Sequence, residues 1–395
     1  MNVTQQGVIT LLRSAITGEK LPLPEGFDLE AADALIQKQG LLPLAYQGAY
    51  HCGINPKSER MLAYQQKYFR EMLRSSRQLQ KAEQLFAAFE ENGIDYLPLK
   101  GCVLKKLYPQ PELRPMGDAD ILIRMEQYEQ IRPIMIRLGF TEDVKSDYDI
   151  HWISKELLAE IHFRLFGPSQ EDLCRYFEDG WKVAVSSNGS RYVFSTEDTF
   201  VYVFCHMAKH FRFMGIGARQ LVDLYVYRRA FPGMDEARIE AVMEQIHMLP
   251  FYWNVRRMLD VWFEGKPWDP VSEFITEYIF SGGSFGSDEK KLYTEEMLRT
   301  KGGEKVANSK ARSLLFALFP GLSHMQLSYN ILFRYPWLCP VFWVIRWVDI
   351  LLHRRGNLRR KLNIIGGISD EGIRTHKQAL EYMGLGYYAT GVEKT

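Results

Sequence analysis

Two short segments alternate apolar and polar residues, and this alternation constrains the fold more than any other feature of the sequence. The first reads DADILI over residues 118–123, and the second reads LLAEIHFRL over residues 157–165. Successive side chains of a β-strand point to opposite faces, so residues i and i+2 share a face. Both segments are therefore predicted to be strands with one apolar face and one face that carries acids.

The first strand places two carboxylates side by side. Asp118 and Asp120 share one face, while Ala119 and Ile121 are expected to face the core. Two like charges held close together repel each other unless a cation lies between them. A divalent cation takes carboxylate oxygens together with substrate phosphates, so this pair is a candidate metal site. The alternative is an exposed strand end with two solvated acids.

The second strand carries a third acid. Glu160 shares a face with His162 and Arg164, whereas Ile161 and Phe163 lie on the other face. A carboxylate flanked by apolar residues on a central strand costs free energy to bury unless it is paired. Glu160 is therefore a candidate metal ligand or general base. The alternative is an edge strand whose polar face holds Glu160–Arg164 ion pairs.

Two features before the first acidic strand are candidates for phosphate contacts. Lys100 and Gly101 join a predicted strand, IDYLPLKG, to a short helix. Glycine lets the backbone approach a ligand closely, a helix N-terminus offers free N–H groups, and Lys100 adds a positive charge. Arg114 lies in the loop before Asp118, where it either contacts a triphosphate through a bidentate fork or pairs with Asp118 or Asp120.

A later helical segment, FCHMAKHF, places His206 and His210 on one helix face, with Lys209 adjacent. These side chains are either ordinary core or surface residues or contacts for a nucleotide or its acceptor. The segment is not HExxH, so a metalloprotease is not supported. Asp223 has apolar neighbours on both sides, and its expected partner is His206, His210 or Arg219.

Helical periodicity dominates the rest of the chain. A long stretch from about Glu59 to Glu91 has apolar residues at helical spacing, and Asn92-Gly93 ends it. We predict an α+β fold in which helical N-terminal and C-terminal segments flank a mixed β-sheet core. The expected divisions are a helical region (1–93), an α/β core (94–195), a helical domain (196–312), and an apolar, aromatic helix with a basic tail (313–395).

The last of these divisions contains an unusual segment, residues 337–361. An apolar helix that contains Trp and has a basic flank fits a membrane surface or a partner protein. The alternative is a helix packed over the protein's own helices, with the basic run as its solvated end. The aromatic residues are Trp337, Trp343 and Trp347, and the basic run is Arg354, Arg355, Arg359, Arg360 and Lys361.

Composition excludes several classes of protein. The 395 residues are 46% hydrophobic and 25% charged, which excludes a wholly disordered chain, a collagen and a long coiled coil. Lys and Arg number 49 against 48 Asp and Glu, so no broad nucleic-acid surface is expected. Five scattered cysteines without CxxC argue against a disulfide framework. With no secretory pattern at the N-terminus and no bilayer-length apolar run, we expect a cytoplasmic protein, with peripheral membrane contact through residues 337–361 as an open alternative.

The order of strand, Lys-Gly, helix, loop, Asp-x-Asp strand, hairpin and Glu strand resembles the nucleotidyltransferase fold shared with DNA polymerase β and the aminoglycoside nucleotidyltransferases. More closely, LPLKGCVLKKLYPQPELRPMGDADILI with LLAEIHFRL is similar to an uncharacterised bacterial nucleotidyltransferase family. The resemblance implies that Gly101 occupies the phosphate turn, that Asp118 and Asp120 bind metal, and that Glu160 is the third acid. Cys102 departs from the serine often found after this glycine, and the gap to Asp118 is longer than in many relatives.

The reaction that this resemblance implies is a metal-dependent transfer of a nucleoside monophosphate from an NTP to an unidentified hydroxyl or phosphate. Mg²⁺ (or Mn²⁺) is the expected cofactor, and the acceptor is a small molecule, a saccharide or a protein. The alternative is a non-catalytic nucleotide-binding regulatory protein or membrane-surface adaptor with the same fold. The predicted catalytic and metal-binding residues are Asp118, Asp120 and Glu160, and the predicted nucleotide contacts are Lys100, Gly101, Arg114, His206, Lys209 and His210.

Overall fold

The structure is a computed structural model, and its contacts divide the chain into two compact units. The first unit comprises Met1–Lys209 and Ile216–Ser284, and the second comprises His210–Gly215 and Phe285–Thr395. The four divisions predicted from the sequence remain a prediction about the chain's organisation. The structure describes residues 1–145, 149–167, 170–300, 331–353 and 369–387, together with residues 315, 318–322, 325, 326 and 329.

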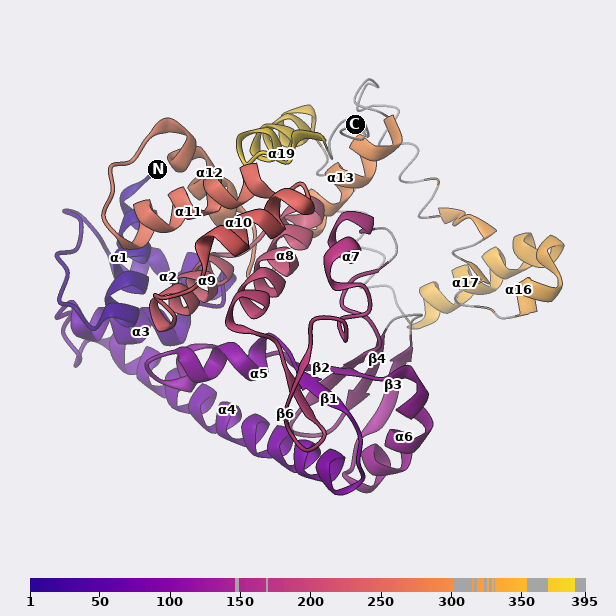
Figure 1. The fold of residues 1–395 in the computed structure, drawn as a ribbon. Coiled ribbons are helices and arrows are strands. Elements are labelled where there is room, and N and C mark those ends of the chain that lie inside the picture. The colour runs from indigo at the N-terminus through magenta and orange to yellow at the C-terminus, as the bar shows by residue number, and fades with distance from the viewer. Residues whose placement is uncertain are drawn as a thin grey trace. The chain divides into compact units, whose positions relative to one another are not determined.

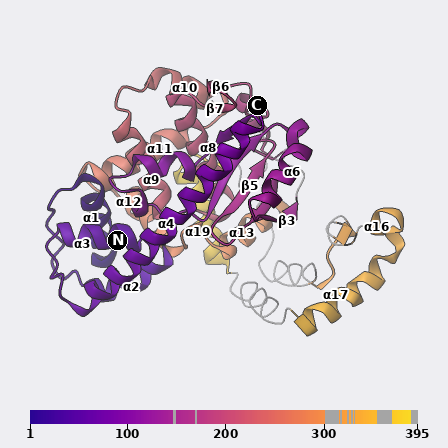
Figure 2. The same cartoon turned by 90° about the horizontal axis from the view of Figure 1, so that it is seen from below.

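The first unit opens with helices, and the longest of them reaches the β-sheet (Figures 1 and 2). This helix, α4, spans Glu59–Glu91 as predicted, and Gly93 follows it with a left-handed φ of 65°. Gly48 brings two of the other helices close together, because a Cβ there would lie 2.0 Å from the carbonyl oxygen of Leu11. The helices before α4 are α1 (Val3–Thr17), α2 (Leu29–Lys38) and α3 (Leu42–His51).

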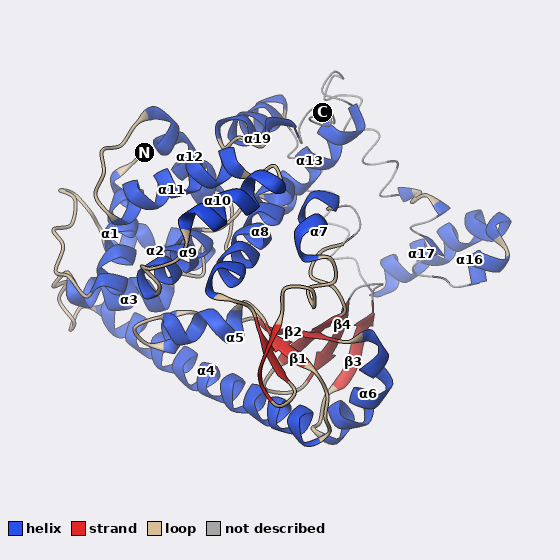
Figure 3. Cartoon of the chain, in the orientation of Figure 1, coloured by secondary structure: helices blue, strands red, loops and turns tan. Residues whose placement is uncertain are grey.

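A mixed β-sheet follows, drawn in red in Figure 3. Its described strands run in the order β3-β4-β5-β2-β1-β7-β6, so β5 is an interior strand rather than the edge strand considered above. The strands β2 and β5 are parallel, and β4 is antiparallel to β5. The strands are β1 (Tyr96–Pro98), β2 (Asp118–Ile123), β3 (Thr141–Lys145), β4 (Asp149–Ile153), β5 (Leu158–His162), β6 (Val185–Asn188) and β7 (Arg191–Val193).

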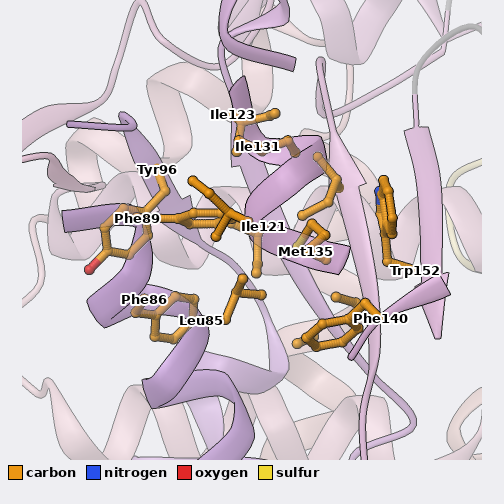
Figure 4. Packing of buried hydrophobic residues seen from close by; sticks show 14 of the residues in the cluster. Leu85, Phe86, Phe89, Tyr96, Ile121, Ile123, Ile131, Met135, Phe140 and Trp152 are labelled. Atoms are coloured by element: carbon orange, nitrogen blue, oxygen red, sulfur yellow. The ribbon is translucent and has the colours of Figure 1, made fainter. Parts of the chain in front are cut away.

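The two faces of this sheet differ in chemistry. Alternate residues of the central strands, including Ile121 of β2 and Ile161 of β5, are fully buried in a hydrophobic core. Phe89 of α4 and Met135 of α6 (Tyr128–Arg137) belong to the same core, which is shown in Figure 4. The residues between them on β2 and β5 face the other way and carry the acids. The predicted alternation is therefore confirmed for both strands.

Short segments and further helices complete the first unit. The connection from β1 to β2 contains α5 (Gly101–Leu104) and the 3₁₀ helices η1 (Lys105–Leu107) and η2 (Pro111–Leu113). A third 3₁₀ helix, η3 (Met125–Gln127), precedes α6. The later helices are α7 (Glu171–Phe177), α8 (Thr196–Met214), α9 (Ala218–Ala230), α10 (Glu236–Gln245), α11 (Leu249–Phe263) and α12 (Pro270–Ser281).

The second unit is helical where the structure describes it. Buried His376 lies on its last described helix, with Nε2 2.7 Å from Thr294 Oγ1. Among the described residues, none of the helices combines the length and apolarity needed to cross a bilayer. The helices that begin in this unit are α13 (Asp288–Thr300), α16 (Ile331–Arg334), η4 (Pro336–Leu338), α17 (Cys339–His353) and α19 (Asp370–Tyr382).

Candidate metal and nucleotide site

Three neighbouring strands bring acids and histidines into one row. Asp120 of β2 is paired in register with Glu160 of β5, and Glu160 is paired with His151 of β4. His162 lies two residues after Glu160 and therefore shares its face. All of these side chains stand on the polar face of the central strands. The register of the three strands therefore places them side by side.

Asp120 is the most buried acid of this group, with 2% of its surface exposed. Its Oδ1 accepts hydrogen bonds from Lys100 Nζ at 2.5 Å and from His162 Nε2 at 3.0 Å. Burial alone would raise the pKa of Asp120, but Lys100 and His162 outweigh it and hold that pKa well below its ordinary value. The carboxylate is therefore ionised and already shared between two donors.

Lys100 reaches Asp120 through an unusual backbone conformation. Its φ of 36° and ψ of −105° lie in a region that residues other than glycine rarely adopt. The alternation of β1, continued to Lys100, would place its side chain on the same face as the buried Tyr96. The backbone turn directs the ammonium group toward Asp120 instead. Burial acts to lower the pKa of Lys100, but the Asp120 carboxylate raises it above its ordinary value.

Glu160 lies between two histidines. Its Oε2 is 3.7 Å from His162 Nε2, and its Oε1 is 3.7 Å from His151 Nε2. Burial and the neighbouring carboxylates of Asp120 and Asp118 raise the pKa of Glu160 to about 8. The sequence predicts repulsion between Asp118 and Asp120, whereas in the structure both of these acids act on Glu160.

Two overlapping groups of side chains could hold a cation, and Glu160 belongs to both. In the described part of the chain, these groups are Asp120, Glu160 and His162, and Asp149, His151 and Glu160. Each offers carboxylate oxygens and an imidazole nitrogen, a donor set that suits Mn²⁺ or Zn²⁺ as well as Mg²⁺.

One detail of His162 tests whether these residues fit a metal. Its Nδ1 atom is buried and has no hydrogen-bond partner among the described residues. The nitrogen that faces both acids is Nε2, which lies 3.0 Å from Asp120 Oδ1 and 3.7 Å from Glu160 Oε2, so a cation held by the two acids would take the place of the hydrogen bond between Nε2 and Asp120. The residues present therefore fit a divalent cation, although Asp120 must share its oxygens with Lys100.

Asp118 is less closely involved than the sequence predicts. It is half-buried and lies in register with Leu158 of β5, at the beginning of β2. It contributes to the raised pKa of Glu160, so it is near the site, but it belongs to neither of the two groups that could hold a cation. Its predicted role as a metal ligand remains a prediction.

The turn at Gly101 offers fewer free N–H groups than a helix N-terminus usually does. The N–H of Cys102 donates to the carbonyl of Leu99, and the N–H of Val103 donates to the carbonyl of Lys100. Burial raises the pKa of the Cys102 thiol to about 12, so this side chain is neutral. Any phosphate contact at this turn would therefore depend chiefly on the Lys100 ammonium.

Arg114 has a partner that the sequence analysis did not foresee. Its Nε and Nη2 donate to the two carboxylate oxygens of Asp223 at 2.7 and 2.9 Å, and Tyr108 donates to the same carboxylate at 2.7 Å. The alternative in which Arg114 pairs with Asp118 or Asp120 is therefore wrong, and its contact with a triphosphate remains a prediction. Of the expected partners of Asp223, Arg219 lies close enough for its charge to interact with the carboxylate, whereas the hydrogen bonds come from Arg114 and Tyr108.

Helix α8 contributes two further polar groups near the acids. Tyr202 is buried, and burial raises its pKa. Lys100 lowers this pKa and the two acids Asp120 and Glu160 raise it, so all three groups lie near the phenol. Burial lowers the pKa of Lys209, and Lys100 lowers it further, so two cations lie close enough to interact.

The two predicted histidines of α8 are placed differently. His206 lies on the same helix, with its ring centroid 6.4 Å from that of Tyr202. His210 belongs to the second unit, so the structure does not place it at this site. The nucleotide contacts predicted for His206, Lys209 and His210 remain predictions.

Sequence analysis missed several side chains of this site. Asp149 and His151 join it only because β4 pairs with β5, and alternation within YDIHWIS carries no sign of that register. Tyr202 stands four residues before His206, so helical spacing could have included it with the predicted contacts.

The fold and the site together define an α+β protein of the nucleotidyltransferase type. A family model described as an uncharacterised nucleotidyltransferase matches residues 25–264, so the chain belongs to this family. The matched region contains the whole sheet and every side chain of the site described above. Neither the curated proteins nor the solved structures gave a match.

Proposed function

We propose that the protein transfers a nucleoside monophosphate from an NTP to a hydroxyl or phosphate of an acceptor. The observation that carries this proposal is the register of two parallel strands, which places Asp120 opposite Glu160 and beside His162. Family membership supports the class of reaction. The nucleotide, the metal and the acceptor are parts of the proposal.

Asp120, Glu160 and His162 would hold a divalent cation, Mg²⁺ or Mn²⁺, and Asp118, two residues before Asp120 on the same face of β2, is a further candidate ligand. When bound, the cation would polarise the α-phosphate and stabilise the pyrophosphate that leaves. Burial and the neighbouring carboxylates raise the pKa of Glu160 to about 8, and a bound cation would favour its ionised form, in which Glu160 could accept the acceptor's proton.

The cations of the site are suited to the triphosphate. Lys100 lies against Asp120, and Lys209 lies close enough to Lys100 for their charges to interact. An incoming triphosphate would offer both ammonium groups an anionic partner. The acceptor oxygen would form a bond to the α-phosphorus, the bond from that phosphorus to the bridging oxygen would break, and pyrophosphate would leave with those electrons.

The decisive experiment follows label from NTP into an acceptor. Purified protein is incubated with cell extract, Mg²⁺ or Mn²⁺, and each NTP labelled at either the α- or the γ-phosphate. Nucleotidyl transfer predicts that α-label enters an acceptor and that γ-label is recovered in pyrophosphate. Entry of γ-label into the acceptor would instead indicate phosphoryl transfer and would overturn the proposed reaction.

A matched pair of variants connects the activity to the site. Asp120→Asn should abolish transfer of α-label. Asp143→Asn makes the same change of charge at an exposed position on β3 of the same sheet, and it should leave transfer unchanged. Equal activity of the two variants would separate the activity from this site.

One observation favours the non-catalytic alternative. Asp120 Oδ1 already accepts hydrogen bonds from Lys100 and His162, so its charge is satisfied without a metal. A nucleotide-binding regulator predicts NTP binding without release of pyrophosphate from any acceptor mixture. Binding measured by calorimetry, beside the label assay, distinguishes the two functions.

A further inference from the structure

A stripe of exposed apolar side chains runs along α17 in the second unit. Val341, Val344, Ile345 and Val348 are each between 46 and 63% exposed. Their spacing of three and four residues places them on one face of the helix. We call these four residues the outer stripe. An exposed apolar patch of this kind usually marks a surface that meets a partner or a membrane.

The opposite side of α17 already has partners. Trp343 Nε1 donates to the carbonyl of Pro320 at 2.9 Å, and Trp347 Nε1 donates to that of Leu318 at 3.1 Å. The ring of Phe319 packs against both tryptophans. Trp343 and Trp347 therefore face inward, as the packed-helix alternative expects for these two residues. The outer stripe is a second apolar face, which the contacts of α17 with other described residues leave exposed.

More apolar surface lies just before α17. Phe333 and Trp337 are 64 and 74% exposed, and Ile331 and Tyr335 are also exposed. Trp is favoured where an apolar surface meets water and lipid headgroups, since its ring is apolar and its N–H is polar. The short helices α16 and η4 therefore extend the apolar character of the outer stripe.

The sequence around this surface is strongly basic. Residues 305–369 contain ten Lys and Arg but a single acid, Asp349. Because the whole chain has a net charge of only +1, the remainder of the chain is net negative. The basic run from Arg354 to Lys361 directly follows α17 in the sequence, although it lies outside the described residues. A basic segment next to an apolar helix face is complementary to an anionic lipid surface.

We propose that the outer stripe docks on the surface of an anionic membrane, to which the excess of Lys and Arg in the sequence of residues 305–369 attracts it. With 15 residues, α17 is about 22 Å long and would lie along the interface. The proposal concerns binding alone and stands independently of nucleotidyl transfer.

Vesicle flotation of the full-length protein tests the proposal. We expect the protein to float with vesicles of phosphatidylcholine and phosphatidylglycerol at low salt. It should float poorly with phosphatidylcholine alone, and added salt should weaken binding because it screens the basic run. Val344→Glu with Ile345→Glu should reduce binding by about tenfold or more, since each change places a charge in the apolar contact.

Matched controls separate this effect from a general change of charge. Val185→Glu with Ile136→Glu makes the same substitutions at positions that are 54 and 60% exposed in the first unit. This control should float like the wild type. Reversal of Arg354, Arg355, Arg359 and Arg360 to Glu should also remove most of the binding.

Three outcomes would overturn the proposal. The first is no flotation of the wild type with anionic vesicles at low salt. The second is equal flotation of the outer-stripe variant and its control. The third is concentration-dependent self-association in size-exclusion chromatography that V344E/I345E abolishes, with no flotation; this would assign the stripe to a second copy of the chain.

Discussion

Arg114 and Asp223 form a buried bidentate ion pair between residues that lie 109 positions apart in the sequence. The pair connects the loop before β2 to helix α9. Arg219 of the same helix also donates to the carbonyl of Pro115 in that loop, at 3.0 Å. Because Asp118 begins β2 just beyond this loop, the pair helps to fix where the acidic strand starts.

We expect Asp223→Asn to lower the free energy of unfolding by about 3 kcal/mol or more, since it leaves the Arg114 charge buried without its partner. Glu83→Gln is the control, because Glu83 pairs with Lys106 on the surface at 3.2 Å with both side chains about half exposed. That change should cost less than about 1 kcal/mol. Urea unfolding followed by fluorescence measures both, and similar losses would contradict a special role for the buried pair.

The two acids of β2 should differ in their effect on stability. Like-charge repulsion alone predicts that both Asp118→Asn and Asp120→Asn leave the fold intact or slightly more stable. The structure changes this expectation for Asp120, because its loss leaves the Lys100 ammonium buried without a carboxylate. Asp120→Asn should therefore destabilise by about 3 kcal/mol, while Asp118→Asn should be nearly neutral. Thermal and urea unfolding without metal should show this order, and its reversal would refute the assigned role of Lys100.

Nucleotide binding should require a divalent cation, because the carboxylates of Asp118 and Asp120, joined by Glu160 when it ionises, would otherwise repel a triphosphate. Calorimetry should detect binding of an NTP with Mg²⁺ or Mn²⁺ and little binding in chelator. Glu160→Gln should weaken the metal-dependent binding without unfolding the protein, because burial and the neighbouring acids raise the pKa of Glu160 to about 8 and so favour its neutral form in the folded state. Equal affinity in chelator would exclude the proposed metal role.

Lys100→Met should change metal and nucleotide affinity in opposite directions. Without nucleotide, Mn²⁺ should bind about tenfold more tightly, because a charge-assisted hydrogen bond worth about 1.5–3 kcal/mol no longer occupies Asp120. NTP should bind more weakly, because a cation for its phosphates is gone. Lys106→Met, at a half-exposed position on the same segment, should change neither affinity. Parallel changes of the two affinities in the Lys100 variant would contradict this account.

His376 should make the second unit sensitive to acid. Burial lowers its pKa from 6.5 to about 3, so the folded state holds the ring neutral while the unfolded chain takes up a proton below pH 6.5. Stability should therefore be fully present above pH 6.5 and fall as the pH decreases toward 3. At pH 5 the loss is about 2 kcal/mol. In denaturant titrations at pH 5 and 7.5, His376→Gln should reduce the difference between the two free energies of unfolding. An unchanged difference would contradict the role assigned to His376.

The parts of the fold that sequence predicted well depend on short-range periodicity. The alternation in DADILI and LLAEIHFRL fixed which side chains share a face, and the helical spacing up to Glu91 fixed the extent of α4. The family resemblance through the Lys-Gly turn and the Asp-x-Asp strand is likewise confirmed.

Periodicity could not predict which elements become neighbours. Nothing near Arg114 identifies Asp223 as its partner, because the contact depends on how α9 packs. The pairing of Lys100 with Asp120 depends on a backbone conformation that strand alternation does not encode. The inward orientation of Trp343 follows from contacts with residues before α16, which helix composition alone does not indicate.

The parallel register of β2 and β5 makes a one-residue misalignment of these two central strands destabilising. A slip of one residue would turn Asp120 toward the core and Ile121 toward the polar face. The misaligned chain would bury the unpaired Asp120 carboxylate among the aromatic and aliphatic side chains that surround Ile121 in the native structure. Burying this carboxylate would cost several kcal/mol. Assembly of the site is therefore a condition of folding. A molecule that has formed its native core therefore also has the side chains of the site aligned. The free energy that favours the native register of the sheet disfavours a compact state in which the site is not formed.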